Sequence, residues 1–364
     1  MDETYYCSRP FEHIELMTDG KVLPCCPPWL NTHYTYGNIE TDSYEELWNG
    51  EKAQEFRRSI LDGSFRHCNR KSCPHLQEKI NTVKKLEDMH HDQIKEDIKK
   101  NLTVLPHGPL EIIFNYDSSC NLACPSCRSS IIMNSKERHG EILEFQRILK
   151  SEYFRDVETF IVTGSGDAFG SPTFRELMQN LEREDCPSLK TLGLLTNALL
   201  AKKYWHTLSD FTLSIIRWIN VSVDAACEET YMVNRWPGRW DVLKENLDFI
   251  KDKKESSSSS LEHFQISFVV QQNNYKEMMD FARMGIEYGC EKIQFQIIER
   301  QFTAMAGGEE AWVKKAVAEP SHPEYQELIK ILIDPIWEQL KNEIDIEFGP
   351  LYDTREREMI RKIK

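Results

Sequence analysis

The chain has 364 residues, more than an average single domain needs, so we expect one large domain and a smaller one. Its 45 Lys and Arg residues against 59 Asp and Glu residues give a net charge of −14, which argues against a nucleic-acid partner, since backbone phosphates are bound by clustered Lys and Arg. No apolar run is long enough to span a membrane and residues 1–6 lack a signal-peptide pattern, so we expect a soluble, cytoplasmic protein with no membrane partner.

The first 75 residues are rich in loop-forming residues and carry five of the eleven cysteines. In a cytosolic chain, cysteines at this density favour metal or redox chemistry over disulfides. A region this small usually needs an additional cross-link, such as a metal site, to stabilise its fold. The order of its motifs resembles the auxiliary-cluster domains called SPASM and twitch, on the following features: Cys7, Gly20-x4-Cys25, Gly37-Asn-Ile, Tyr44-Glu-Glu-Leu-Trp, Cys68 and Cys73.

This resemblance implies one auxiliary iron–sulfur cluster, of the 4Fe–4S type, within residues 1–75. Its ligands would be Cys7, Cys25, Cys68 and Cys73. Cys26 is the rival of Cys25, because two adjacent cysteines rarely bind one cluster. Structural zinc is the alternative occupant, since four thiolates suit either metal. Relatives usually carry this domain after their catalytic domain, whereas here it comes first.

Residues 76–105 follow as a segment with apolar residues at three- to four-residue spacing. The spacing predicts an amphipathic helix that links two domains, with its many charges forming a solvated face. The apolar positions are Leu76, Ile80, Val83, Leu86, Met89, Ile94 and Ile98.

From residue 106 to about residue 300, short apolar runs alternate with helical stretches. Such runs are typical of parallel strands buried on both faces, and six strand–helix units in series predict a parallel α/β fold. The expected strands are 110–116, 159–163, 191–195, 218–223, 264–270 and 293–298, and helices are expected at 174–182, 242–250 and 275–288. We expect residues 301–364 to cap this domain.

Three cysteines follow the first of these strands in the spacing CxxxCxxC: Cys120, Cys124 and Cys127. Three thiolates on one loop can hold three corners of a cubic iron–sulfur cluster, whose fourth iron stays open, whereas a structural zinc site normally offers four closed ligands. Together with Asn121 and Leu122, this loop resembles the CNLxCxxC signature of radical S-adenosylmethionine (SAM) enzymes. Many members have an aromatic residue where this chain has Ser126. The resemblance implies their partial (β/α)6 TIM-type barrel, with the trio holding a 4Fe–4S cluster that binds SAM.

Polar residues follow the next three strands of the predicted barrel. Residues 163–170 are rich in glycine, which lets the backbone approach a ligand, and a carboxylate there can pair with an ammonium group. Residues 165–168 resemble the "GGEP" motif that binds the methionine amine of SAM, and residues 196–198 and 222–225 resemble "TNG" and "SVDG" motifs. The resemblance therefore implies a SAM pocket with these contacts: Ser165, Gly166, Asp167, Asn197, Ser222, Asp224 and Arg235.

By resemblance, the chain cleaves SAM reductively and the 5′-deoxyadenosyl radical removes a hydrogen atom from a substrate. We expect a ribosomally made peptide as substrate, although no separate leader-binding domain is evident, and flavodoxin or ferredoxin as electron donor. Oxidation or epimerisation of a sugar- or cyclitol-like alcohol is the alternative reaction. The alternative from a different functional class is a non-catalytic scaffold that binds zinc.

Cys227 lies just after the fourth predicted strand and so near the expected reaction site. A thiol at this position could return a hydrogen atom to a substrate radical, as in radical SAM epimerases, which makes Cys227 the candidate catalytic residue. The alternative is that Cys227 packs as a small hydrophobic side chain, which is how free cysteine usually behaves.

Overall fold

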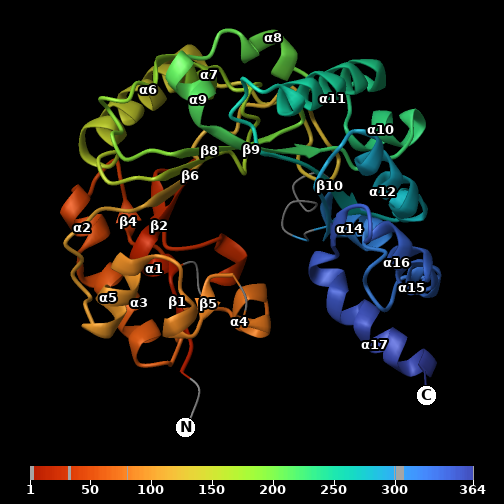
Figure 1. Cartoon of the computed structure of the whole chain (residues 1–364), viewed down its shortest axis with the longest axis horizontal. Coiled ribbons are helices and arrows are strands. Elements are labelled where there is room, and N and C mark those ends of the chain that lie inside the picture. Colours follow the sequence, from red (N-terminus) through yellow and green to blue (C-terminus); the bar gives the residue numbers. More distant parts are fainter. Residues whose placement is uncertain (1–3, 32–33, 80, 299, 301–306, 364) are drawn as a thin grey trace. The chain divides into compact units, whose positions relative to one another are not determined.

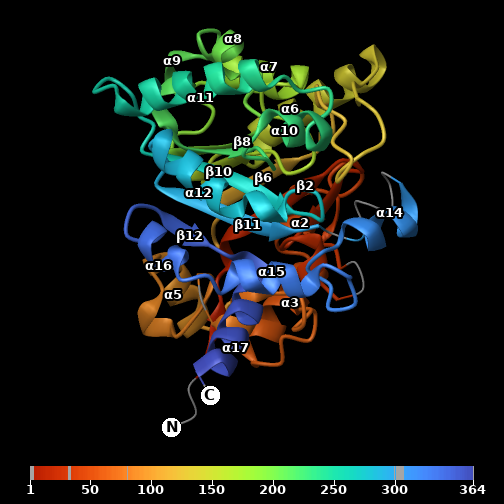
Figure 2. The same ribbon diagram turned by 90° about the vertical axis from the view of Figure 1, so that its right-hand side faces the viewer.

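The computed structural model describes residues 4–31, 34–79, 81–298, 300 and 307–363. Residues 1–3 and 32–33 of the predicted auxiliary-cluster segment, and residues 299 and 301–306 near the predicted end of the barrel, lie outside the described residues. The chain divides into two compact units, drawn in Figure 1 and, turned by 90°, in Figure 2. Unit 1 takes residues up to 118, 134–166 and 180–192, and unit 2 takes residues 119–133, 167–179 and 193 onward. The predicted segments 1–75, 76–105, 106–300 and 301–364 stay a prediction.

Unit 1 contains a sheet in which strands from the first 40 residues pair with predicted barrel strands. The central strand β2 is parallel to β6, which is parallel to β7, whereas β3 and β4 are added as antiparallel strands. Aromatic rings from β6, β7 and the chain before β7 pack together in its core, with ring centroids of Phe114, Phe154 and Phe160 between 4.6 and 6.1 Å apart. The strands are β2 (His13–Met17), β3 (Lys21–Leu23), β4 (Gly37–Asn38), β6 (Glu111–Asn115) and β7 (Thr159–Val162).

The N-terminal part of unit 1 is built from short helices held by buried side chains. Ser43 and Glu46 form a reciprocal capping box that starts α2, as the Ser-x-x-Glu sequence favours. Trp48 at the end of α2 is buried, its indole N–H donates to the carbonyl of His107, and the Arg57 guanidinium lies 4.5 Å from its ring. The elements are β1 (Tyr6–Cys7), α1 (Arg9–Glu12), η1 (Pro27–Trp29), α2 (Tyr44–Trp48), α3 (Glu51–Leu61), α4 (Pro74–Glu78) and α6 (Lys136–Glu152).

The prediction of one helix over residues 76–105 is wrong. Helix α4 ends at Glu78, because Lys79 and Asn81 both adopt the left-handed backbone conformation. A short strand β5 (Val83–Lys84), a 3₁₀ turn η2 (Leu86–Asp88) and the helix α5 (Asp92–Lys99) follow. Several predicted apolar positions are nevertheless buried, namely Val83, Met89, Ile94 and Ile98. The apolar periodicity therefore agrees with the burial of these four positions, but it does not correspond to a single helix.

Unit 2 contains parallel strands in the order β8, β9, β10, β11 and β12. The predicted α/β class is confirmed, and the observed strands lie within two residues of the expected ones. Figures 1 and 2 show α11 and α12 on the outside of β9 and β10. Because the strands are parallel, their carboxyl ends share one edge, where polar loops collect. The strands are β8 (Thr191–Thr196), which begins in unit 1, β9 (Ile216–Ser222), β10 (His263–Val270), β11 (Lys292–Ile297) and β12 (Asp345–Glu347).

The helices of unit 2 follow its strands, and the last ones form the C-terminal part of the chain. Residues 325–340 form two helices with Pro335 between them, as expected for a residue that cannot continue a helix. The bounds are α7 (Pro172–Asn180), α8 (Ala201–Trp205), α9 (Asp210–Ile215), α10 (Glu228–Asn234), α11 (Trp240–Glu255), η3 (Tyr275–Glu277), α12 (Met278–Glu287), α14 (Gly308–Lys315), α15 (Tyr325–Leu332), α16 (Ile336–Leu340), η4 (Gly349–Leu351) and α17 (Tyr352–Ile363).

Candidate functional site

The three-cysteine loop of unit 2 is held by backbone hydrogen bonds at both ends and in the middle. Cys120 N–H donates to the carbonyl of Ile132, and Ala123 N–H donates to the carbonyl of Trp236, both at 2.8 Å. Leu122 is 1% exposed, and Cys120 and Cys124 pack around it with Cys127 alongside. The backbone therefore fixes the three thiols on one short, buried loop.

Each of the three sulfurs receives a hydrogen bond from a different side chain. Asn197 Nδ2 lies 3.8 Å from the Cys120 sulfur, Arg235 Nη1 3.7 Å from that of Cys124, and Arg128 Nε 3.4 Å from that of Cys127. Hydrogen bonds of this kind stabilise metal-bound thiolates and tune the cluster that they hold. Burial raises the pKa of Cys120 to about 12 and also raises the pKa of Cys124, so a metal must displace the thiol protons when it binds.

Arg235 is held in place by Asp224, so two predicted SAM contacts form an ion pair beside Cys124. Arg235 Nη2 lies 2.7 Å from Asp224 Oδ2, and the other Asp224 oxygen accepts the N–H of Val269 at 2.7 Å. Asp224 adopts the left-handed backbone conformation at the end of β9, with φ of 59°. Ser222, two residues earlier, is the last residue of β9 and accepts a hydrogen bond from Ser267 at 3.4 Å.

The buried carboxylate of Asp167 connects the loop after β7 with the end of β8 through hydrogen bonds. One of its oxygens accepts the N–H groups of Phe169 and Gly170, at 3.0 and 2.7 Å. The other accepts the Thr196 hydroxyl and the Asn197 N–H, at 2.9 and 2.6 Å. These four bonds use the whole accepting capacity of a carboxylate. Any contact between Asp167 and a SAM amine would have to replace one of them.

We therefore expect Asp167→Ala to act first on stability. The substitution leaves four buried donors without an acceptor, so the free energy of unfolding should fall by about 3 kcal/mol. The measurement is urea unfolding of anaerobically purified protein, with Asp241→Ala as control, because the Asp241 carboxylate is 64% exposed and pairs with Arg239 on the surface. Unchanged stability combined with weaker SAM binding would instead make Asp167 a direct contact of the cofactor.

The other predicted SAM contacts, Ser165 and Gly166, belong to unit 1. The Ser165 hydroxyl donates to the carbonyl of Asn115 at 2.8 Å. The N–H groups of Ser165 and Gly166 donate to the Thr163 hydroxyl at 3.1 and 3.0 Å. Their geometry is thus set by the ends of β6 and β7, and a role in SAM binding stays a prediction.

Cys227 immediately precedes α10 and is partly buried. Its thiol donates toward the hydroxyl of Thr230 at 3.5 Å and toward a carboxylate oxygen of Glu277 at 3.6 Å. Thr230 donates to the same oxygen, and the other Glu277 oxygen accepts the Ala226 N–H at 2.6 Å. Cys227 is therefore part of a polar cluster and does not pack as a simple hydrophobic side chain. Hydrogen-atom donation by this thiol stays a prediction.

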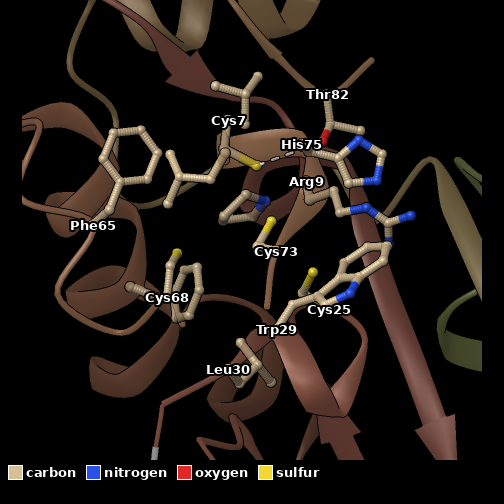
Figure 3. A pocket seen from close by; sticks show the side chains of 14 residues that line it. Cys7, Arg9, Cys25, Trp29, Leu30, Phe65, Cys68, Cys73, His75 and Thr82 are labelled. Carbon is tan, nitrogen blue, oxygen red and sulfur yellow. Dashed lines mark hydrogen bonds between the residues drawn. The ribbon is translucent and has the colours of Figure 1, made fainter. Parts of the chain in front are cut away.

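The four predicted auxiliary cysteines line one cavity in unit 1. Figure 3 shows the sulfurs of Cys7, Cys25, Cys68 and Cys73 directed into the same space from separate parts of the chain. Apolar and aromatic side chains complete the wall, among them Trp29, Leu30, Phe56 and Phe65. Cys26 is more exposed than Cys25 and is not among the residues that line this cavity, so the geometry favours Cys25 over its neighbour.

Burial raises the pKa of Cys7 to about 11 and that of Cys68 to about 12, and it also raises those of Cys25 and Cys73. In Cys7 and Cys73, backbone N–H groups partly oppose this effect. In the described part of the chain, no group of three or more His, Cys, Asp or Glu residues is arranged to hold a single metal ion. Four thiolates around one pocket suit either an iron–sulfur cluster or zinc, so the choice between the two metals at these residues stays a prediction.

Two arginines beside the cysteines, Arg128 and Arg9, are not among the site residues predicted from the sequence. Arg128 directly follows Cys127 and donates to its sulfur. Arg9, two residues after Cys7, lines the auxiliary cavity. A cation next to a cysteine was the available signal, because a positive charge stabilises a thiolate. This signal is weak in the present chain, because charged residues are common throughout it.

Comparisons with known proteins show what the chain is similar to. Residues 7–74 match the model of SPASM, an iron–sulfur cluster-binding domain. The chain is 27% identical over 200 residues to the GTP 3′,8-cyclase of Thermodesulfovibrio yellowstonii (strain ATCC 51303 / DSM 11347 / YP87), a match that covers 54% of this chain and 56% of the cyclase. The chain thus spans little more than half the length of this curated relative. The predicted resemblance to SPASM domains is confirmed.

Two solved structures are among those that match the chain. One is Streptococcus suis SuiB bound to precursor peptide SuiA, with a TM-score of 0.47, 14% identity, and coverage of 100% of this chain and 74% of SuiB. The other is native anSMEcpe with bound AdoMet, with a TM-score of 0.44, 22% identity, and coverage of 65% of this chain and 63% of anSMEcpe.

Proposed function

We propose that this chain, which belongs to the radical SAM proteins with a SPASM iron–sulfur domain, cleaves SAM reductively and modifies a ribosomally made peptide. One observation carries the proposal: three thiols on one loop, two of them buried and one partly buried, each with its own hydrogen-bond donor. This donor set fits a 4Fe–4S cluster with one open iron. The bound cofactors supply a 5′-deoxyadenosyl radical that removes a hydrogen atom from the substrate.

In this proposal, the residues of the chain bind the cluster and SAM and orient them. Cys120, Cys124 and Cys127 would be the ligands of the SAM-binding cluster, while Arg235 places a positive charge beside Cys124 and is itself fixed by Asp224. Asp167 ties the loop that follows β7 to the end of β8 and so keeps Asn197 against Cys120. A rigid surround of this kind preorganises a site and keeps water out of it.

The surface beside the cysteine loop supports a peptide as substrate. Ile131 and Met133 near the end of this loop are 44% and 52% exposed. Met232, Val233 and Trp236 are between 52% and 57% exposed, and the Trp236 carbonyl holds the loop at Ala123. Exposed apolar side chains gathered near a site suit the apolar side chains of a peptide better than a polyhydroxylated sugar. Oxidation or epimerisation of a sugar- or cyclitol-like alcohol remains the alternative reaction.

Turnover with candidate peptides tests the proposal. Anaerobically purified protein is incubated with SAM, dithionite and peptides encoded by neighbouring genes, and mass spectrometry follows 5′-deoxyadenosine and the mass of each peptide. We expect both 5′-deoxyadenosine and a modified peptide. Modification of a sugar-like alcohol but of no peptide would favour the alternative reaction, and colourless protein containing zinc would support the scaffold hypothesis.

The same incubation in deuterated water, with Cys227→Ala beside the wild type, examines the proposed thiol. If Cys227 donates a hydrogen atom, the wild-type product gains solvent deuterium and the variant does not. An unlabelled wild-type product, formed at the same rate by Cys227→Ala, would remove Cys227 from the reaction.

A further inference from the structure

A buried cation lies on the wall of the four-cysteine cavity in unit 1. Arg9 begins the short helix α1, and its side chain lines this cavity beside Trp29 and His75. The guanidinium carbon lies 5.5 Å from the centre of the Trp29 ring, and the rings of Trp29 and His75 meet edge to face at 4.9 Å. Figure 3 shows these three side chains together along one side of the cavity.

Hydrogen bonds on its far side hold the guanidinium in one orientation. Arg9 Nη1 lies 2.8 Å from Nε2 of His13, which is completely buried. Since arginine only donates, Nε2 must accept, and the ring proton therefore sits on Nδ1, which donates to Glu111 at 2.7 Å. Glu15 lies 3.7 Å from the same guanidinium nitrogen. Two buried groups, His13 and Glu15, thus hold Arg9 Nη1, and Glu111 in turn holds His13.

One buried donor of Arg9, its Nε–H, has no hydrogen-bond partner within the part of the chain that the structure describes. A buried donor of this kind normally finds an acceptor. The positive charge acts on the thiols: burial raises the pKa of Cys25 well above its ordinary value, and Arg9 is the strongest influence in the opposite direction. The backbone N–H of the same residue stabilises the thiolate of Cys7.

We propose that Arg9 is a positioning residue for the auxiliary cluster, which donates its Nε–H to a cluster or cysteine sulfur and raises the cluster's reduction potential. This inference rests on the proposed presence of an iron–sulfur cluster in the cavity. Adding an electron makes the cluster more negative, so a fixed positive charge and a hydrogen bond to sulfur both favour the reduced state. The His13 and Glu111 contacts would keep this charge directed at the cluster in both redox states.

Redox titration of the anaerobically purified full-length protein, followed by EPR, tests this role. Titrations with and without SAM separate the two clusters, because only the signal of the SAM-binding cluster should change when SAM is added. We expect Arg9→Gln to shift the midpoint potential of the SAM-insensitive signal to a more negative value, and Arg9→Lys to shift it less because the charge is kept. Arg66→Gln is the matched control, because Arg66 also lies two residues from a predicted ligand but is 40% exposed. A loaded Arg9→Gln protein with the wild-type potential would overturn the proposal.

A second measurement needs no variant and so does not depend on Arg9→Gln retaining its cluster. Wild-type protein is made with arginine labelled with ¹⁵N throughout the guanidinium group, and pulsed EPR measures the coupling of ¹⁵N to the reduced auxiliary cluster. The proposal requires a coupling, and its absence in a loaded protein would overturn it. Wild-type protein with zinc or no auxiliary signal would instead refute the cluster itself, so the two failures are distinguishable.

Discussion

Replacing Cys120, Cys124 and Cys127 together with alanine should remove about four irons per chain and abolish 5′-deoxyadenosine formation. The three thiols lie on one loop, and their donors Asn197, Arg235 and Arg128 come from outside or from the edge of that loop. Without the thiolates, these donors have no cluster to hold and SAM has no open iron to bind. The measurements are iron content, visible absorption and chromatographic detection of 5′-deoxyadenosine after reduction.

The matched control changes buried cysteines elsewhere in the fold. Cys186→Ala with Cys290→Ala removes two thiols that are at most 6% exposed, and the part of the chain that the structure describes places neither in the three-cysteine loop nor at the auxiliary cavity. This double variant should keep its iron and its SAM cleavage, at a modest cost in stability from the small cavities it creates. SAM cleavage that survives the triple substitution would show that the cysteine loop is not the site of the reaction.

Local spacing is enough to single out the cysteine loop, because its three cysteines lie within eight residues. The partners of these cysteines could not be predicted in the same way. Arg235 is 111 positions from Cys124 in sequence, and only the return of the chain after β9 brings the two together. Asp167 illustrates the same limit: its sequence context resembled a ligand-binding motif, but residues at the end of β8 occupy one of its oxygens.

The strands were predicted closely because buried parallel strands are short apolar runs. The helix expected over residues 76–105 failed for a local reason, since Lys79 and Asn81 take a left-handed conformation that the apolar periodicity does not encode. The pairing of β2 with β6 was not foreseen either, because it joins segments almost a hundred residues apart. Sequence patterns thus identified the strands and the candidate ligands, whereas the non-local partners of these residues required the fold.

The second large effect is expected from the auxiliary cavity. Replacing Cys7, Cys25, Cys68 and Cys73 together with alanine should remove about four irons and leave the SAM-binding cluster in place. It should also destabilise residues 4–31 and 34–79, because metal binding in a small loop-rich region contributes directly to its folding free energy. Metal analysis gives the iron lost, and limited proteolysis followed by mass spectrometry locates the region that opens.

Cys26→Ala is the matched control for Cys25→Ala, because the two cysteines are adjacent but only Cys25 lines the cavity. We expect Cys25→Ala to lose auxiliary iron and Cys26→Ala to keep it. The reverse result would mean that this segment rearranges when the cluster binds, since Cys26 is not among the residues that line the cavity in the structure. Zinc in the wild-type site would be a stronger contradiction, because four thiolates suit either metal and zinc would take the place of the cluster. A cluster places each thiolate on a different iron, so about four irons bound to these cysteines would distinguish it from a single zinc ion.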